Sequence, residues 1–199
     1  MSGPRWRPPS SAAVCGSGPT LLRGGHPTRE YPVTDLSLVI RPERTEDASA
    51  IERLHARAFG PGRFARTAYR LREGAAERMD LGITASVGSF LVGSVRMGPV
   101  RAGATPFVML GPLAVDPSFE GRGIGGTLTR AAIEGARKAG EGLVILVGDS
   151  PYYGRLGFTP VPPGRLVLPG PVDPARLLWL ELVDGFRDRA VGLVEAVRA

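Results

Sequence analysis

The chain has 199 residues, 43% of them hydrophobic, and a formal net charge of +6 at pH 7. These values predict a folded domain with a hydrophobic core, and no apolar run approaches the ~20 residues that a membrane span needs. A single cysteine excludes a disulfide framework and favours a cytoplasmic location. No metal site is predicted. Nucleic-acid binding is not expected, because much of the excess positive charge comes from Arg5, Arg7, Arg23 and Arg29.

Residues 1–35 are rich in Pro, Gly, Ser and Arg and show no hydrophobic periodicity. Such a composition cannot offset the entropy of ordering the chain, so it predicts a disordered tail. Residues 36–199 are predicted to form a single domain that begins with a strand over residues 36–41, LSLVIR.

Two helices are predicted to follow that strand. Thr45, with Glu46 and Asp47 behind it, predicts the capped start of the first helix, whose buried stripe comprises Ile51, Leu54 and Ala58. His55 stands beside this stripe and is predicted to lie on the helix surface rather than to act as a base. The second helix is predicted over residues 64–72.

Three strands are predicted next. Residues 81–87 and 90–97 form a hairpin that turns at Gly88-Ser89, and residues 107–115 form the third strand. Antiparallel pairing is expected because the connections are short.

Pro112 interrupts the third of these strands, because proline has no N–H group to donate to a sheet ladder. The Gly111-Pro112 pair therefore predicts a bulge or a locally open edge. An open edge there lets the amides of a ligand pair with the strand backbone near Leu113 and Val115.

A glycine turn and a helix come after the third strand. Small and apolar residues recur at helical spacing as far as Gly140, at positions Leu128, Ala131, Ala132, Gly135, Ala136 and Ala139. No Ser, Asp or Asn is placed to cap this helix, and its start is occupied by Gly121, Gly123, Gly125 and Gly126. The free N–H groups and partial positive charge of a helix N-terminus, with Arg122 beside them, favour a phosphate site over a tight turn packed on a sheet.

The remaining elements complete a mixed α+β domain. Residues 143–147 predict a buried strand that ends at Asp149, as a strand–helix–strand crossover requires. Residues 177–183 predict another strand, followed by a short helix near the C-terminus. Their order with the preceding hairpin predicts a mostly antiparallel sheet.

Three pieces in order carry a resemblance to a known family: LAVDP, EGRGIGG and YYGRLGF. They resemble motifs of the GNAT superfamily of acetyl-CoA-dependent N-acetyltransferases, and LGPLAVDP with GDSPYYGRLGF is similar to a bacterial branch whose substrates are mostly unassigned. The resemblance implies a central, twisted, mostly antiparallel sheet flanked by helices, with a splayed fourth strand.

The resemblance also implies roles for individual residues. The strand backbone at Leu113, Ala114 and Val115 would pair with the pantetheine arm of acetyl-CoA, and the pyrophosphate would lie on the turn formed by Gly121, Arg122, Gly123, Gly125 and Gly126. Tyr153 aligns with the tyrosine that often serves as general acid, and a phenol with a reference pKa of about 10 stays protonated at neutral pH. Tyr152 is interpreted as a packing residue. Glu120 departs from the usual glutamine or arginine and is expected to weaken binding of the donor.

The function implied is transfer of an acetyl group from acetyl-CoA to a primary amine by direct attack. Two alternatives remain at this stage, a non-catalytic acetyl-CoA sensor and a dinucleotide-binding Rossmann unit, since GRGIGG also matches Gly-x-Gly-x-x-Gly with Asp149 beyond it. The general base is left open between Asp149 and a chain of waters. The acceptor is left open among a small-molecule amine, a peptide N-terminus and a protein lysine, and so is assembly as a homodimer.

Overall fold

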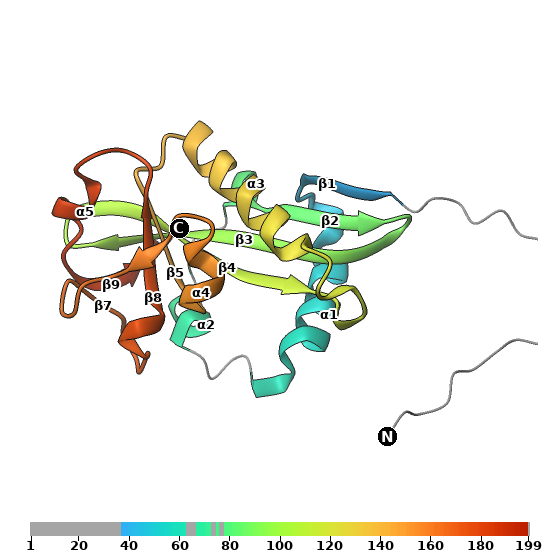
Figure 1. The fold of residues 1–199 in the computed structure, drawn as a ribbon, viewed down its shortest axis with the longest axis horizontal. Helices are drawn as coiled ribbons and strands as arrows, with labels where there is room; N and C mark the ends of the chain where they lie inside the picture. The colour runs from blue at the N-terminus through green and yellow to red at the C-terminus, as the bar shows by residue number, and fades with distance from the viewer. Residues whose placement is uncertain (1–36, 63–66, 73–74, 76–77, 199) are drawn as a thin grey trace, which may run out of the picture. The chain divides into compact units, whose positions relative to one another are not determined.

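The structure, a computed structural model, describes residues 37–62, 67–72, 75 and 78–198 (Figure 1). The predicted tail over residues 1–35 and the first residues of the predicted second helix, 64–66, lie outside the described residues. None of the helices formed by the described residues is long and apolar enough to cross a membrane.

The strands form a mixed sheet in which most pairs are antiparallel. Its order along the main path is β1 (Leu38–Pro42), β2 (Ile83–Val87), β3 (Phe90–Ala102), β4 (Thr105–Val115), β5 (Leu143–Val147), β8 (Leu177–Glu181) and β6 (Thr159–Pro160). Off this path, β9 (Gly192–Ala196) pairs with β3, and β7 (Leu166–Val167) pairs with β9. Within the described residues the parallel pairs are β4–β5 and β7–β9. The predicted α+β class and antiparallel character are confirmed.

The helices are α1 (Ala48–Phe59), α2 (Thr67–Arg72), α3 (Ile124–Lys138), α4 (Ser150–Gly154) and α5 (Phe186–Arg189). α1 and α3 cover opposite faces of the sheet (Figure 1). A Cβ atom on Gly93 would contact Leu128 of α3, whereas the next residue of β3, Ser94, contacts His55 of α1. Successive side chains of a strand point to opposite faces, so the two helices sandwich β3.

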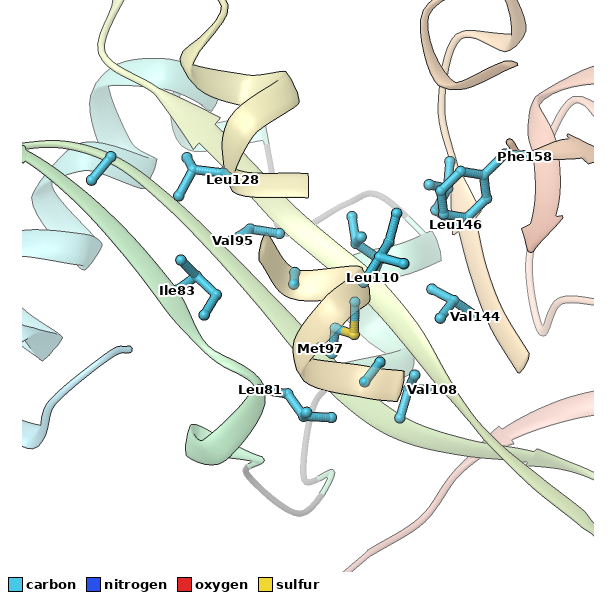
Figure 2. Packing of buried hydrophobic residues seen from close by; sticks show 14 of the residues in the cluster. Leu81, Ile83, Val95, Met97, Val108, Leu110, Leu128, Val144, Leu146 and Phe158 are labelled. Atoms are coloured by element: carbon cyan, nitrogen blue, oxygen red, sulfur yellow. The ribbon is translucent and has the colours of Figure 1, made fainter. Parts of the chain in front are cut away.

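The core divides along the same two faces. On the α3 face, Leu128 belongs to the same buried cluster as Ile83, Val95 and Leu110 (Figure 2). On the other face, a second cluster is built by the alternate residues of β4 and β5 with β8 and β9, namely Phe107, Met109, Leu143, Ile145, Trp179 and Val194. Strands β4 and β5 therefore contribute buried side chains to both faces, which explains their nearly continuous apolar sequences.

The start of α1 differs from its prediction. A 3-10 turn over Thr45–Asp47 precedes the helix, which begins at Ala48. The Asp47 carboxylate accepts hydrogen bonds from both terminal nitrogens of Arg41, at 2.7 and 2.8 Å, and from the Arg44 amide at 2.9 Å. The acidic first turn thus anchors the helix start to β1.

His55 is buried, so the prediction that it lies on the helix surface is wrong. Only 4% of its surface is exposed, and its Nε2 lies 3.1 Å from the Ser94 hydroxyl oxygen on β3. Because α1 packs across both β3 and β4, the residue that follows Leu54 also faces the sheet. Helical periodicity alone does not show that a strand packs on this side of the helix, or that Ser94 of that strand offers a hydroxyl group to His55.

The hairpin at Gly88-Ser89 is confirmed, but β3 continues to Ala102 and recruits a strand that was not predicted. Val100 and Ala102 of β3 pair with Ala196 and Val194 of β9. The short apolar sequence of β9 is ambiguous in isolation, and only this long-range pairing makes it a strand.

Candidate active site

The site lies where β4 and β5 separate. Their parallel pairing is limited to Val108 with Val144 and Met109 with Ile145, although β4 continues to Val115. A cavity of about 710 Å³ opens beyond the last pair, bordered by both strands and by α4. The predicted splay of the fourth strand is confirmed.

A bulge in β4 precedes the open edge, as Pro112 predicted. Val95 pairs with Leu113 and Met97 pairs with Leu110, so β4 carries one residue more than β3 over this interval. The Asp116 amide donates to the Val92 carbonyl at 2.8 Å. Since amides alternate in direction along a strand, the N–H of Ala114 also faces β3, whereas those of Leu113 and Val115 face the side of β5.

The start of α3 is a bare helix N-terminus. Gly123 is the N-cap residue, with φ of +77°, and no side chain caps the helix. Gly121 also has a positive φ, of +74°, and Cβ atoms on these two glycines would meet no heavy atom within 4 Å. Residues 121–123 are exposed and Gly125 and Gly126 are partly exposed. The amides of this turn are therefore open to an anion, as a phosphate site requires.

Two side chains flank this turn. The guanidinium of Arg122 lies 5.3 Å from the ring centre of Phe119, which holds a positive charge beside the helix N-terminus. The Glu120 side chain is exposed, so its negative charge is well solvated.

Asp116 ties the turn to α1. Its carboxylate accepts a hydrogen bond from the Ser118 amide at 3.1 Å and contacts the guanidinium of Arg57 at 2.9 Å. The Ser118 amide, together with Arg57, lowers the pKa of Asp116 from its ordinary value. The loop that leads into the glycine turn is therefore fixed at both its strand and its helix neighbours.

Tyr153 lies on α4 at the edge of the cavity. Its ring meets the rings of Phe158 and Tyr152 edge-on, with centroids 5.8 and 4.8 Å apart. A Cβ atom on Gly148 would lie 2.2 Å from Cε2 of Tyr153, so the ring occupies space that only a glycine leaves free. Burial, and to a lesser degree Tyr152, raises the pKa of Tyr153 to about 12, while the nearby charge of Arg176 opposes the rise.

Tyr152 lies between the glycine turn and the cavity. Its ring packs on Tyr153, as expected, but 39% of the residue is exposed. Its hydroxyl oxygen is 2.8 Å from where a Cβ atom of Gly125 would be, and the side chains of Val115 and Leu113 are 3.7 and 3.8 Å from the same point. Burial raises the pKa of this phenol. The two adjacent tyrosines in the sequence were the signal that Tyr152 reaches a different place from Tyr153, because adjacent residues of a helix point in different directions.

Two further segments, α2 and the chain after β7, form the far wall of the cavity. α2 contributes Thr67 and Tyr69, and the chain after β7 contributes residues 171–173 and Arg176. The Thr67 hydroxyl donates to the Pro171 carbonyl at 3.0 Å, which joins these two segments. Asp149 lies on the rim, whereas His55 and Glu120 do not line the cavity. In the part of the chain that the structure describes, no group of three or more His, Cys, Asp or Glu residues is arranged to hold a metal ion.

Comparisons with known proteins agree with this geometry. Residues 83–160 match the acetyltransferase (GNAT) domain family. The chain is 35% identical over 118 residues to the uncharacterised N-acetyltransferase YjhQ of Escherichia coli K12, covering 57% of this chain and 65% of YjhQ, just under two thirds of its length. It is 30% identical over 123 residues to the uncharacterised N-acetyltransferase YhbS of the same strain, covering 61% of this chain and 73% of YhbS.

Two solved structures extend the comparison. E. coli YhbS in complex with CoA superposes with a TM-score of 0.71 at 27% identity, over 83% of this chain and 93% of YhbS. A GNAT acetyltransferase of Brucella melitensis in complex with acetyl-CoA superposes with a TM-score of 0.55 at 28% identity, over 73% of this chain and 97% of the other.

These results decide between the fold alternatives. A Rossmann unit needs a parallel sheet on both sides of its glycine turn, whereas β4, which leads into this turn, pairs antiparallel with β3. The fold instead superposes on that of the GNAT protein YhbS over 83% of this chain. The chain belongs to the GNAT family of N-acetyltransferases.

Proposed function

We propose that this chain transfers the acetyl group of acetyl-CoA to a primary amine by direct attack on the thioester. The observation that carries the proposal is that Leu113 borders both the glycine turn and the cavity that holds Tyr153. Leu113 lies beside Gly125 at one end and lines the cavity at the other. A long donor with a phosphate end and a reactive end fits such an arrangement.

The donor would be held mainly by backbone. The amides between Gly121 and Gly126 would bind the pyrophosphate, with Arg122 adding positive charge. The amides of Leu113 and Val115 would pair with the pantetheine arm, while Ala114, which is buried, would support the strand. The exposed carboxylate of Glu120 would repel the phosphates weakly, because solvent screens it.

In the reaction, the nitrogen of a neutral amine forms a bond to the thioester carbon, and the carbon–sulfur bond breaks as CoA leaves. The phenol of Tyr153, with its pKa raised to about 12, stays protonated throughout the neutral range. It transfers its proton to the departing sulfur, which leaves as a thiol, and the phenolate regains a proton from water. The proton lost by the amine leaves through Asp149, on the rim of the cavity, or through water.

We also propose a cytoplasmic location and assembly as a homodimer. The single cysteine in the sequence supports a cytoplasmic location. Assembly as a homodimer stays a prediction.

The proposal is tested by titrating the purified protein with acetyl-CoA in a calorimeter, with NADH as the control, and then measuring CoA release with a panel of amines. We expect binding of acetyl-CoA alone and amine-dependent release of CoA. Binding of NADH, or of neither ligand, contradicts the proposal. Tight binding of acetyl-CoA without any amine-dependent release favours the sensor alternative.

A further inference from the structure

The cavity carries two opposite charges that do not neutralise each other. Arg176 and Asp149 both line it. In the described part of the chain, neither the guanidinium of Arg176 nor the carboxylate of Asp149 has a side-chain hydrogen bond or an ion pair. Both residues are exposed, where an ion pair between them would stabilise the protein little, so both charges stay accessible to a ligand.

The backbone fixes Arg176. Its amide donates to the Asp173 carbonyl and its carbonyl accepts from the Gly148 amide, both at 2.9 Å. The ring of Tyr153 packs on Gly148, so the side chain of Arg176 starts close to Tyr153, the proposed acid. The closeness agrees with the effect of the Arg176 charge on the Tyr153 phenol.

The third charged residue of the cavity has a structural task. One carboxylate oxygen of Asp173 accepts from the Ala175 amide at 3.0 Å and caps the 3-10 turn that carries Arg176. Asp173 keeps its negative charge, but among the charged described residues that line the cavity only Arg176 and Asp149 make no side-chain hydrogen bond.

The rest of the lining is mostly apolar and closed on one side. Apolar side chains are supplied by Phe59, Leu110, Leu113, Leu146, Val147 and Val172. The hydrogen bond between Thr67 and Pro171 joins α2 to the opposite loop. A cavity of about 710 Å³ that also receives the acetyl end of the donor leaves space for a small molecule rather than for a folded protein surface.

We propose that the acceptor is a free amino acid with an apolar side chain, whose carboxylate binds Arg176 and whose amino group lies beside Asp149. This inference rests on the proposed function and names its acceptor class. An arginine fork matches a carboxylate geometrically, and a carboxylate next to the amine holds it close to the thioester. The lysine of a protein carries no carboxylate beside its amine and is therefore expected to be a poor acceptor.

The test measures binding, so it does not depend on turnover. With the protein saturated with CoA, calorimetry compares three pairs of probes that differ in one carboxylate: L-alanine and ethylamine, L-leucine and 3-methylbutylamine, and L-phenylalanine and 2-phenylethylamine. We expect at least one amino acid to bind about tenfold more tightly than its partner amine. Equal affinity within every pair, tighter binding of the amines, or no binding of any probe overturns the inference.

Variants locate the effect. Arg176→Gln is expected to remove the preference for the amino acid, whereas the matched Arg53→Gln, on the exposed side of α1, is expected to retain it. Asp149→Asn is expected to weaken both members of a pair. A preference that persists in Arg176→Gln overturns the assignment. Acetyl-CoA is titrated into separate samples of the same proteins that contain neither CoA nor probe. Failure to bind it overturns the proposed function itself, whereas tight binding with no preference within the pairs overturns only the acceptor class.

Discussion

The two ends of the site are built in different ways. The end at α3 consists of backbone amides and glycines within a few consecutive residues, is exposed, and has no capping side chain. The end at Tyr153 consists of side chains from α1, α2, β4, β5, α4 and the chain before β8, and much of it is buried. One end is therefore local in sequence, and the other exists only after folding.

Because of this difference, the two ends of the site are suited to recognise different substrates. Amides bind any suitably shaped anion, so the α3 end suits a donor that all members of a family share. Side chains set charge and shape individually, so we expect the acceptor to be distinguished at the Tyr153 end. Variants at the two ends are accordingly expected to change different quantities.

The largest effect is expected at the side-chain end, from Tyr153→Phe. Loss of the hydroxyl removes the donor to the leaving thiolate, so the rate of CoA release should fall by about a thousandfold, with acetyl-CoA affinity nearly unchanged. Because the pKa of Tyr153 is raised to about 12, its acidic form persists, and the wild-type rate should not decline up to about pH 10 through this group. Steady-state rates across pH check both statements, and a comparable rate in Tyr153→Phe contradicts the role. Tyr152→Phe is the comparison, and is expected to alter donor affinity more than turnover.

Gly148→Ala is expected to have the next largest effect. The new methyl group would meet the Tyr153 ring at 2.2 Å, and displacing the acid should lower turnover by about a hundredfold. Gly154→Ala is the matched control, because a Cβ atom there meets nothing within 4 Å. Equal turnover in the two variants would show that Tyr153 needs no such positioning.

At the backbone end, Gly123→Ala should weaken acetyl-CoA binding by about tenfold, because the methyl group occupies the approach to the amides. The control is Gly140→Ala at the other end of α3. The two glycines have nearly the same φ, +77° and +79°, and equally open surroundings, so backbone strain is matched. Calorimetry with acetyl-CoA distinguishes them, and equal losses would attribute the effect to strain alone.

The smallest effect is expected from Arg57→Gln, which removes the ion pair between α1 and the loop before the glycine turn. The pair is partly exposed, so donor affinity should fall by less than about threefold, with a small decrease in Tm at pH 7. Because the pKa of Asp116 is lowered in the folded protein, its stabilisation is complete above its ordinary pKa of about 3.9 and is lost as the pH falls through the lowered value. The Tm difference between wild type and variant should therefore shrink below about pH 4. A constant difference would mean that Arg57 acts without Asp116.

The same contrast explains what the sequence alone predicted. The uncapped helix start, the bulge at Pro112 and the strand–helix–strand unit depend on neighbouring residues, and all were predicted correctly. Thr67 and Arg176 were not identified, because each reaches the cavity through a partner distant in sequence.

The errors have the same physical origin. His55 was placed on a surface because its helix was considered without the strand that supplies Ser94. β9 was missed because its apolar residues become a strand only against the extension of β3. Local preference predicts elements, whereas pairing across the sheet decides burial and the final strands.

The short pairing of β4 with β5 has a consequence for the stability of the protein in the cell. A donor that pairs with the part of β4 beyond Met109, as proposed, would bind only the folded chain, so we expect folding and donor binding to be thermodynamically linked. A ligand that binds only the folded state stabilises it in proportion to the logarithm of its concentration. The lifetime of this protein would then rise and fall with the supply of acetyl-CoA, before any acceptor is consumed.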